Sequence, residues 1–520
     1  MPLQEIPPAA RKALLLYEDR WFYEHPGVNP ASMLRAVWQM LTGGRRQGAS
    51  TLTMQVARIV YHIDSSSVSG KLLQIVRALQ LEIFYSKDEI LEAYFNLAPY
   101  GGNIEGIAAA AQVWFNTPVS RLNLPQILTL TVIPQNPVKR SPATPAGLKN
   151  AAAAAARLKE LWREKHPVSA DDNLNLPLSS GRFLPHEAPH AVRRLRETAR
   201  GKIAATLDEN LQKQTEAILS KYVKDNAGRG IFNAAAILVD YKTAEVLAAV
   251  GSADFFNEKI DGQVDGTAAL RSPGSALKPF IYALALDQGL IHPRTMLKDV
   301  PKNYGLYTPE NFDRSFYGLV NATQALVYSR NIPAVDLLLR LEENSFYQML
   351  EKAGVKKLKT PGYYGLALAL GGAEVSAQDL AALYAMLGNG GKFRPLRWRK
   401  DEPQLPETAM LSPEAAFLTL DMLSYNAPVD RRRLPFAKRS GTPYKVYWKT
   451  GTSYGYKDAW AAGLFGDFVL VVWVGNFDGT PNPAFTGREA AAPLFFRLVR
   501  QIAAGRGIAG DSIRPDGLNL

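Results

Sequence analysis

The 520-residue sequence predicts a multidomain protein that is all-α in its first third and α/β in the remainder. The chain is longer than one ordinary hydrophobic core supports. Apolar residues recur at helical spacing as far as about residue 165, whereas apolar runs of strand length begin only beyond residue 230. We therefore expect a first domain at 1–165, a linker at 166–203 and a second domain at 204–520.

The first domain reads as a series of helices joined by short loops. Ser86 and Glu89 form a capping box at the start of one of them. Asn29 can cap the start of another helix, with Pro30 at its first position. The expected helices cover residues 9–17, 30–41, 51–61, 71–84, 87–96, 104–114 and 124–132.

The linker and the second domain differ in composition from the first. Residues 166–203 are rich in Pro, Ser and Asn and end in a basic run, which is typical of a linker. The apolar runs beyond it predict an antiparallel sheet flanked by helices, which we expect to pack in two layers. The expected strands cover residues 234–240, 244–251, 444–449, 459–465 and 468–476.

Charge and composition narrow the classes of function. The net charge of +12 indicates either an anionic partner, such as a phosphate-bearing substrate, an acidic lipid or nucleic acid, or simply a soluble surface. The absence of cysteine excludes disulfides and thiol catalysis, and six histidines argue against a multi-histidine metal site. No run approaches the roughly 18 apolar residues of a membrane span, and the N-terminus lacks a signal pattern. Either the protein is cytosolic or a targeting segment is missing from this sequence.

A candidate nucleophile, Ser275, lies in the string RSPGSALKPF three residues before Lys278. Residues three apart share a helix face, so the lysine can serve as the base for the serine. The lysine must then be neutral, which requires burial or a neighbouring cation. Such a pair is common by chance, and by itself it would be an exposed helix turn.

Two later strings strengthen this assignment. Ser329 and Asn331 form an S-x-N string, and Lys449 begins KTGTS. In this order the three strings are the signature of penicillin-binding proteins and serine β-lactamases. Ser329 can relay a proton between the lysine and a leaving amine, and Asn331 can hold both the lysine and a substrate amide. Ser424 starts a second S-x-N string, but Ser329 is preferred because it precedes a helical run and lies well before KTG.

The KTG string has its own expected chemistry. Lys449, Thr450 and Thr452 should bind a peptide carboxylate from a strand edge, and Gly451 allows close approach. Residues 204–500 resemble the transpeptidase domain of penicillin-binding proteins, also through 368–391 and 449–460. The resemblance implies that Ser275 is acylated by a D-Ala-D-Ala stem peptide or trapped by β-lactams, without a cofactor.

The first domain carries three further strings. These are EDxxFxxHxG from Glu18, GASTLTMQ at 48–55 and KDEILEAYFN at 87–96. Over residues 6–165 they resemble the glycosyltransferase domain of bifunctional class A penicillin-binding proteins, although an acidic pair in a helix is by composition usually a solvated face. The resemblance implies a lysozyme-like fold that polymerises lipid II, with Glu18 as general base in an inverting displacement of lipid-linked diphosphate. It also implies a substrate-binding set: Asp19, His25, Ser50, Thr51, Gln55, Lys71 and Gln74.

Gln74 departs from the family pattern, which has an acidic residue there. Either its hydrogen bonds suffice, or polymerase activity is weakened. The family pattern leaves a divalent metal, Mg or Mn, as an option for this domain. At Gln74 and in the string GREAAAPLFFRL at 487–498, the chain resembles the 1C subgroup of the family.

The whole chain is accordingly expected to be a peptidoglycan glycosyltransferase and transpeptidase. The alternatives are a penicillin-binding scaffold with a weakened or lost activity, and a D,D-carboxypeptidase or β-lactamase-like hydrolase. Expected partners are lipid II, nascent peptidoglycan, β-lactams, the membrane surface and other cell-wall enzymes, but not nucleic acid. The resemblance implies the periplasmic face of a bacterial inner membrane and an N-terminal anchor that this sequence lacks. The run 33–41 would suit the membrane interface or a core helix equally.

Overall fold

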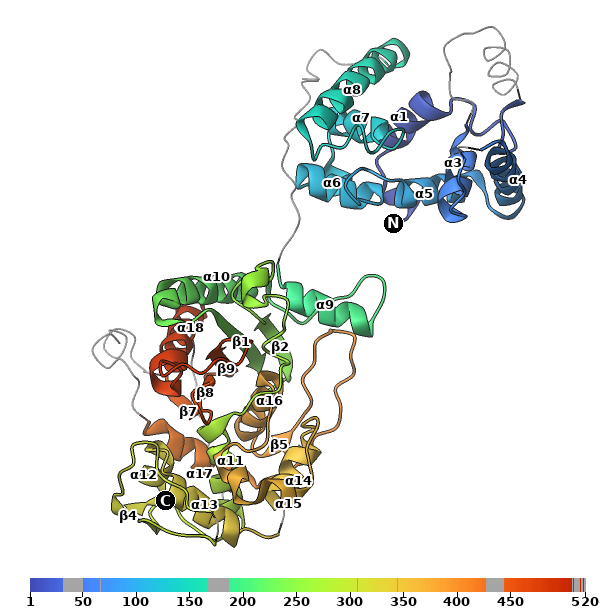
Figure 1. Ribbon diagram of the computed structural model, residues 1–520. Helices are drawn as coiled ribbons and strands as arrows, with labels where there is room; N and C mark the ends of the chain where they lie inside the picture. The colour runs from blue at the N-terminus through green and yellow to red at the C-terminus, as the bar shows by residue number, and fades with distance from the viewer. Residues whose placement is uncertain are drawn as a thin grey trace. The chain divides into compact units, whose positions relative to one another are not determined.

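The computed structural model describes residues 1–30, 50–65, 67–166, 187–305, 307–343, 345–426 and 444–506, together with 508, 515 and 518. It divides into two compact units, Met1–His186 and Glu187–Leu520 (Figure 1). The division lies inside the segment 166–203, and helix α9 of the second unit, Pro189–Thr198, falls in the later part of that segment. The apolar run 33–41 lies outside the described residues.

The described part of the first unit is helical, as the periodicity predicts. Thr51 caps α3 by accepting a hydrogen bond from the backbone of Met54, and the capping box of Ser86 and Glu89 begins α5. The helices enclose one hydrophobic core that includes Trp114 and Tyr94. They are α1 (Pro8–Glu18), α3 (Leu52–Val60), α4 (Val68–Phe84), α5 (Lys87–Leu97), α6 (Ile107–Phe115), α7 (Leu124–Val132) and α8 (Pro145–Lys165).

The second unit is built on a five-stranded sheet in the order β2-β1-β9-β8-β7. Every neighbouring pair is antiparallel, and β1–β2 and β8–β9 are the hairpins that the sequence indicates. Strand β7 forms one edge. The strands are β1 (Asn233–Asp240), β2 (Glu245–Val250), β7 (Val446–Thr452), β8 (Asp458–Phe465) and β9 (Phe468–Gly475), and two small sheets pair β3 (Met296–Asp299) with β4 (Gly318–Asn321) and β5 (Lys392–Phe393) with β6 (Thr408–Ala409).

Helices cover both faces of this sheet, so the expectation of two layers is wrong. In β1, Ala236 and Leu238 pack in the core that contains α10 and α18, whereas Ile237 and Val239 pack in the core of the opposite face. Strands β8 and β9 are buried at every position, because continuous apolar runs need cover on both sides. The helices are α10 (Glu209–Asn226), α11 (Lys278–Asp287), α12 (Ala322–Val327), α13 (Asn331–Arg340), α14 (Ser345–Lys352), α15 (Pro361–Tyr364), α16 (Ala377–Gly388), α17 (Pro413–Ser424) and α18 (Ala492–Gly505).

The start of α11 lies against the edge strand β7. Ser275 belongs to a short 3-10 turn, Gly274–Leu277, that leads directly into α11. A Cβ atom at Gly451 of β7 would lie 2.0 Å from the backbone oxygen of Pro273. The glycine of KTG is therefore required because the backbone before Ser275 approaches the strand at this point.

Candidate active sites

Lys278 lies at the centre of the site in the second unit. Its side chain is fully buried, and its Nζ donates hydrogen bonds to the backbone oxygens of Ser329 (2.7 Å) and Arg330 (3.1 Å) and to Asn331 Oδ1 (2.5 Å). Burial, followed by the positive charges of Lys449 and Arg330, holds the pKa of Lys278 well below its ordinary value of 10.5. Both conditions that a neutral lysine base needs are thus present.

Ser329 lies between the two buried lysines. Its backbone oxygen accepts the hydrogen bond from Lys278, and its Oγ accepts one from Lys449 Nζ at 2.7 Å. Its φ of 60° is in the left-handed region, which costs energy in a residue other than glycine. Ser329 thus contacts both amines, Lys278 through its backbone oxygen and Lys449 through its hydroxyl group. The alternative residue, Ser424, instead donates to the backbone oxygen of Asp421.

Ser275 is half-buried and one turn away from Lys278. Among the described residues, no hydrogen bond engages its hydroxyl, and Lys278 Nζ donates to three acceptors that all belong to residues 329–331. These three contacts use all the N–H donors of an ammonium group, so the base form of the lysine must release one of them to take the serine proton. The S-x-N residues therefore hold the amine of Lys278 in place.

The KTG strand supplies a second buried amine. Burial, together with the charge of Arg488, lowers the pKa of Lys449 to about 7. Thr450 is half-buried on the same strand, and Thr452 Oγ1 accepts a hydrogen bond from the backbone of Gly487 at 2.9 Å. Gly487 is the first residue of the string GREAAAPLFFRL, and this string therefore contacts the KTG strand. A cation with neighbouring hydroxyls on an edge strand is suited to bind a carboxylate.

We expect Lys449→Met to raise the thermal stability of the protein near neutral pH. The pKa of Lys449 is about 7 in the folded protein and 10.5 in its ordinary state, so the unfolded chain binds more protons between these values. The buried amine therefore costs no stability above about pH 10, where it is neutral in both states. As the pH falls toward 7, the unfolded chain takes up the proton first and the folded protein loses stability. The gain should be roughly 1–3 kcal/mol in the free energy of unfolding, partly offset by the lost hydrogen bond to Ser329.

Calorimetry at about pH 6.5 and about pH 9.5 measures this effect. The gain from Lys449→Met should shrink at the higher pH. An equal change at both pH values would contradict the electrostatic origin. Lys445→Met, near the start of the same strand, is the control for the loss of a lysine at a more exposed position.

Glu18, the last residue of α1, carries the candidate chemistry of the first unit. Its Oε2 accepts a hydrogen bond from Gln55 Nε2 at 2.9 Å, whereas its buried Oε1 has no partner among the described residues. Burial raises the pKa of Glu18 above 4.5, against the hydrogen bond from Gln55 and the positive charge of Arg140. A buried, unpaired carboxylate oxygen with a raised pKa is suited to remove a proton from a hydroxyl group.

Three of the predicted substrate-binding residues lie beneath this site. Asp19 accepts hydrogen bonds from His25 Nε2 and from the backbone of Leu52, both at 3.0 Å, and thereby holds the first turn of α3. Thr51 Oγ1 donates to the backbone oxygen of Gly27 at 2.6 Å. Asp19, His25 and Thr51 are buried, and their hydrogen bonds hold the start of α3 beside Glu18; their predicted contact with a substrate stays a prediction.

Gln74 is buried and joins α4 to α3. Its Oε1 accepts a hydrogen bond from Lys71 Nζ at 2.8 Å, and its Nε2 donates to the backbone oxygen of Met54 at 2.6 Å. Lys71 Nζ also donates to Ser50 Oγ at 2.6 Å. Burial, followed by the charge of Arg58, lowers the pKa of Lys71. The amide thus uses both its acceptor and a donor, and an ionised carboxylate could supply only the acceptor.

The donor set around Gln74 does not fit a divalent metal. The oxygen of its amide faces the ammonium group of Lys71. Within the described residues there is no group of three or more acidic or histidine side chains that could hold an ion. The positive charge at this position belongs to the lysine.

We expect Gln74→Glu to destabilise the first unit above about pH 6. The new carboxylate would gain attraction from Lys71 but would place a negative oxygen against the backbone oxygen of Met54. The cost should be on the order of 1–3 kcal/mol. Burial next to an acceptor should raise the pKa of the new carboxyl group above its unfolded value of about 4.3. The Gln74→Glu protein should then keep its stability below about pH 4.3, the unfolded pKa, and should lose it as the pH rises through the raised pKa of the folded protein.

Urea unfolding of wild type, Gln74→Glu and Gln74→Met at about pH 5 and about pH 8 measures this loss of stability as a change in the free energy of unfolding. Gln74→Met has similar length and no charge, so its deficit should be the same at both pH values. A Gln74→Glu protein as stable as wild type at pH 8 would show that the amide donor is unimportant.

Sequence reasoning missed several residues that hold the two sites in place. Around Lys278 these are Arg330, Asp299 and Asn311, and near Glu18 they include Arg140. The sequence could have pointed to Arg330, because it is the central residue of the S-x-N string. The others lie in no recognisable pattern and reach the sites only through the fold.

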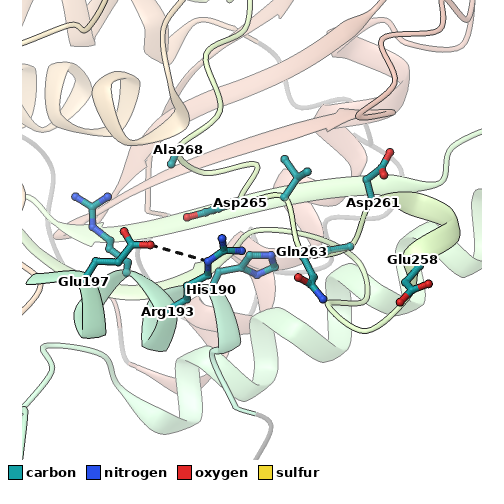
Figure 2. Close-up of a pocket in the computed structure, with 11 residues that line it drawn as sticks. His190, Arg193, Glu197, Glu258, Asp261, Gln263, Asp265 and Ala268 are labelled. Atoms are coloured by element: carbon teal, nitrogen blue, oxygen red, sulfur yellow. Dashed lines mark hydrogen bonds and ion pairs between the residues drawn. The ribbon is translucent and has the colours of Figure 1, made fainter.

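A separate cavity of about 670 Å³ lies between α9 and the loop 258–268 (Figure 2). Figure 2 shows Arg193 and Glu197 of α9 paired on one side and Asp261 and Glu258 on the other. The cavity contains none of the residues that surround Ser275, and His190 in its lining already forms a hydrogen bond with the backbone oxygen of Gly262.

Comparison with known proteins matches a family model to each of the two units. The transglycosylase family model matches residues 1–164, and the penicillin binding protein transpeptidase domain model matches residues 234–498. The chain belongs to the penicillin-binding proteins and, with both domains in this order, to their bifunctional class A.

Individual members of this family are similar to the chain over most of its length. The chain is 38% identical to penicillin-binding protein 1C of Escherichia coli over 95% of its own length and 63% of that protein. It is 29% identical to penicillin-binding protein 1F of Bacillus subtilis over 98% of its length and 74% of that protein. The crystal structure of penicillin-binding protein 1A from Haemophilus influenzae shares the fold, with a TM-score of 0.61 at 17% identity and 89% coverage of each chain. The similarity to the 1C protein agrees with the subgroup that the sequence indicates.

Proposed function

We propose that this chain is a peptidoglycan synthase that polymerises lipid II with its first unit and cross-links stem peptides with its second. The observation that carries the proposal is the buried amine of Lys278, held beside Ser275 by the S-x-N residues and flanked by Lys449. The assembled geometry of both sites supports an enzyme over a scaffold.

In the second unit, Ser275 Oγ would attack the carbonyl carbon of the penultimate D-alanine while its proton passes to neutral Lys278. The C–N bond to the terminal D-alanine breaks, and the leaving amine takes a proton through Ser329. The product is an ester on Ser275, which an amine of a second peptide then attacks to form the cross-link. Lys449 with its neighbouring threonines would bind the terminal carboxylate, and a β-lactam would be held as a similar ester.

In the first unit, Glu18 Oε1 would accept the proton of the acceptor sugar's 4-hydroxyl as that oxygen attacks the anomeric carbon of the lipid-linked donor. The bond to the diphosphate breaks on the opposite face, which inverts the configuration. Lys71, held by Ser50 and Gln74, would stabilise the charge of the departing diphosphate. No step in this scheme passes through a metal.

An apolar stripe on α4 supports contact with a membrane surface, where the lipid-linked substrate would reside. Val68, Leu72, Val76 and Ile83 recur along the helix, and each has 59% or more of its surface exposed. We propose that the protein acts at the periplasmic face of a bacterial inner membrane, with nascent peptidoglycan and other cell-wall enzymes as its partners. None of the described helices has the length and hydrophobicity to cross a bilayer.

Two assays on the wild-type protein test the proposal. Fluorescent penicillin should label the chain in a one-to-one ratio that survives denaturation, and lipid II in detergent should be converted to glycan polymer. Absence of both products would overturn the proposed function. If wild type made no polymer but Gln74→Glu did, the first site would be a decayed one and the scaffold interpretation would gain support.

A further inference from the structure

Arg330, the central residue of the S-x-N string, is buried beneath the active-site turn. Its side chain is 4% exposed, and its Nε donates to Asp299 Oδ2 at 2.7 Å. Its Nη1 donates to Asp313 Oδ2 at 2.9 Å, and its Nη2 donates to the backbone oxygen of Ser315. The guanidinium carbon lies 4.1 Å from the ring centroid of Tyr317. One arginine thereby joins the active-site turn to the loop that follows β3.

The carboxylate that receives Arg330 is itself fully buried. Asp299 also accepts hydrogen bonds from Asn311 Nδ2 at 2.7 Å and from the backbone of Tyr317 at 3.0 Å. A buried carboxylate that loses its cation remains costly even when other hydrogen bonds persist. Although burial alone would raise it, the hydrogen bond from Arg330 holds the pKa of Asp313 down at about 2. Asp313 is therefore a charged partner of the arginine at neutral pH.

The same network reaches the catalytic groups through the backbone. The carbonyl oxygen of Arg330 is one of the three acceptors of Lys278 Nζ. On the other side, the backbone N–H of Asn331 donates to Asn311 Oδ1 at 2.7 Å. Ser329 between these anchors has a φ of 60°, a conformation that persists only where the surroundings impose it.

We propose that Arg330, clamped by Asp299 and Asp313, is a positioning residue that fixes the turn 329–331 and so aligns Lys278 with Ser329 during acylation of Ser275. The inference rests on the acylation put forward in the proposed function. Because the side chain of Arg330 is buried, it acts through the turn and not by touching the substrate.

The principal test is the acylation kinetics of Arg330→Met with a fluorescent penicillin at saturating and limiting concentrations. We expect the limiting acylation rate constant to fall about 10- to 100-fold with little change in the concentration for half-saturation. The acid limb of the pH–rate profile should move to higher pH. The charged groups facing Lys278 are Lys449, Arg330 and Asp299, and the variant removes one cation and leaves the carboxylate.

Two companion variants separate charge from geometry. Arg330→Lys keeps the positive charge but not the planar fork, so its rate constant should fall while the acid limb stays near that of wild type. Asp299→Asn combined with Arg330→Met removes both opposite charges, and its acid limb should return toward the wild-type position. Arg314→Met is the matched control, since Arg314 lies in the same loop, is exposed and pairs only loosely with Glu310 at 3.8 Å.

The outcomes distinguish this inference from simple structural damage. If Arg330→Met lowers only the fraction of chains that label, while the labelled chains keep the wild-type rate constant and pH profile, the positioning role is overturned. The positioning role is also overturned if the limiting acylation rate constant of Arg330→Lys equals that of wild type. Failure of wild type to label would overturn the proposed acylation itself, whereas normal labelling of wild type with unchanged kinetics in the variants would overturn this inference alone.

Discussion

Ser275→Ala is expected to abolish covalent labelling by penicillin while leaving glycan polymerisation intact. Ser275 lies one turn before a buried lysine whose pKa is held low, and alanine removes the only atom that can form the ester. Mass spectrometry of the intact chain after incubation with penicillin measures the result. Wild type should gain the mass of one β-lactam, and the variant none.

Ser272→Ala is the matched control for this experiment. Ser272 lies three residues earlier, and its hydroxyl donates to the backbone oxygen of Gly371. This variant should label like wild type. An adduct on Ser275→Ala equal to that on wild type would show that the acylated residue lies elsewhere.

Glu18→Gln should lower the rate of lipid II polymerisation by about 10³-fold, in the range that a general base contributes. The amide has nearly the same shape and can still bond to Gln55, but it cannot accept a proton on the atom that is buried and unpaired in wild type. Burial raises the pKa of Glu18, so the polymerisation rate of wild type should fall with decreasing pH along a limb above 4.5.

Glu24→Gln provides the comparison, because Glu24 is an exposed acid six residues later in the same motif region. It should polymerise lipid II like wild type. Penicillin labelling should be unchanged in both variants, since the second unit has its own core. Polymer formed by Glu18→Gln at the wild-type rate would remove Glu18 from the role of base.

Much of the fold could be predicted from local patterns. The helix start at Ser86 is encoded within four residues, and the hairpin of β8 and β9 follows from two apolar runs around a tight turn. Cover on both faces of the sheet was not predicted, although the run 468–474 is apolar at every position. Apolar runs of strand length predict where the strands lie. The number of layers, however, depends on which helices pack against each face of the sheet.

The sequence by itself determined which residue types are candidates for catalysis and their order, because Ser275, Ser329 and Lys449 lie in short recognisable strings. It also identified Gln74 as a departure. Only the tertiary structure decided that Gln74 bridges Lys71 and the backbone of Met54, and that Arg330 anchors the turn above Asp299. The contacts of Gln74 with Met54 and of Arg330 with Asp299 join residues that are 20 and 31 positions apart. No local pattern specifies such pairs, since their proximity and burial arise only when the elements pack together.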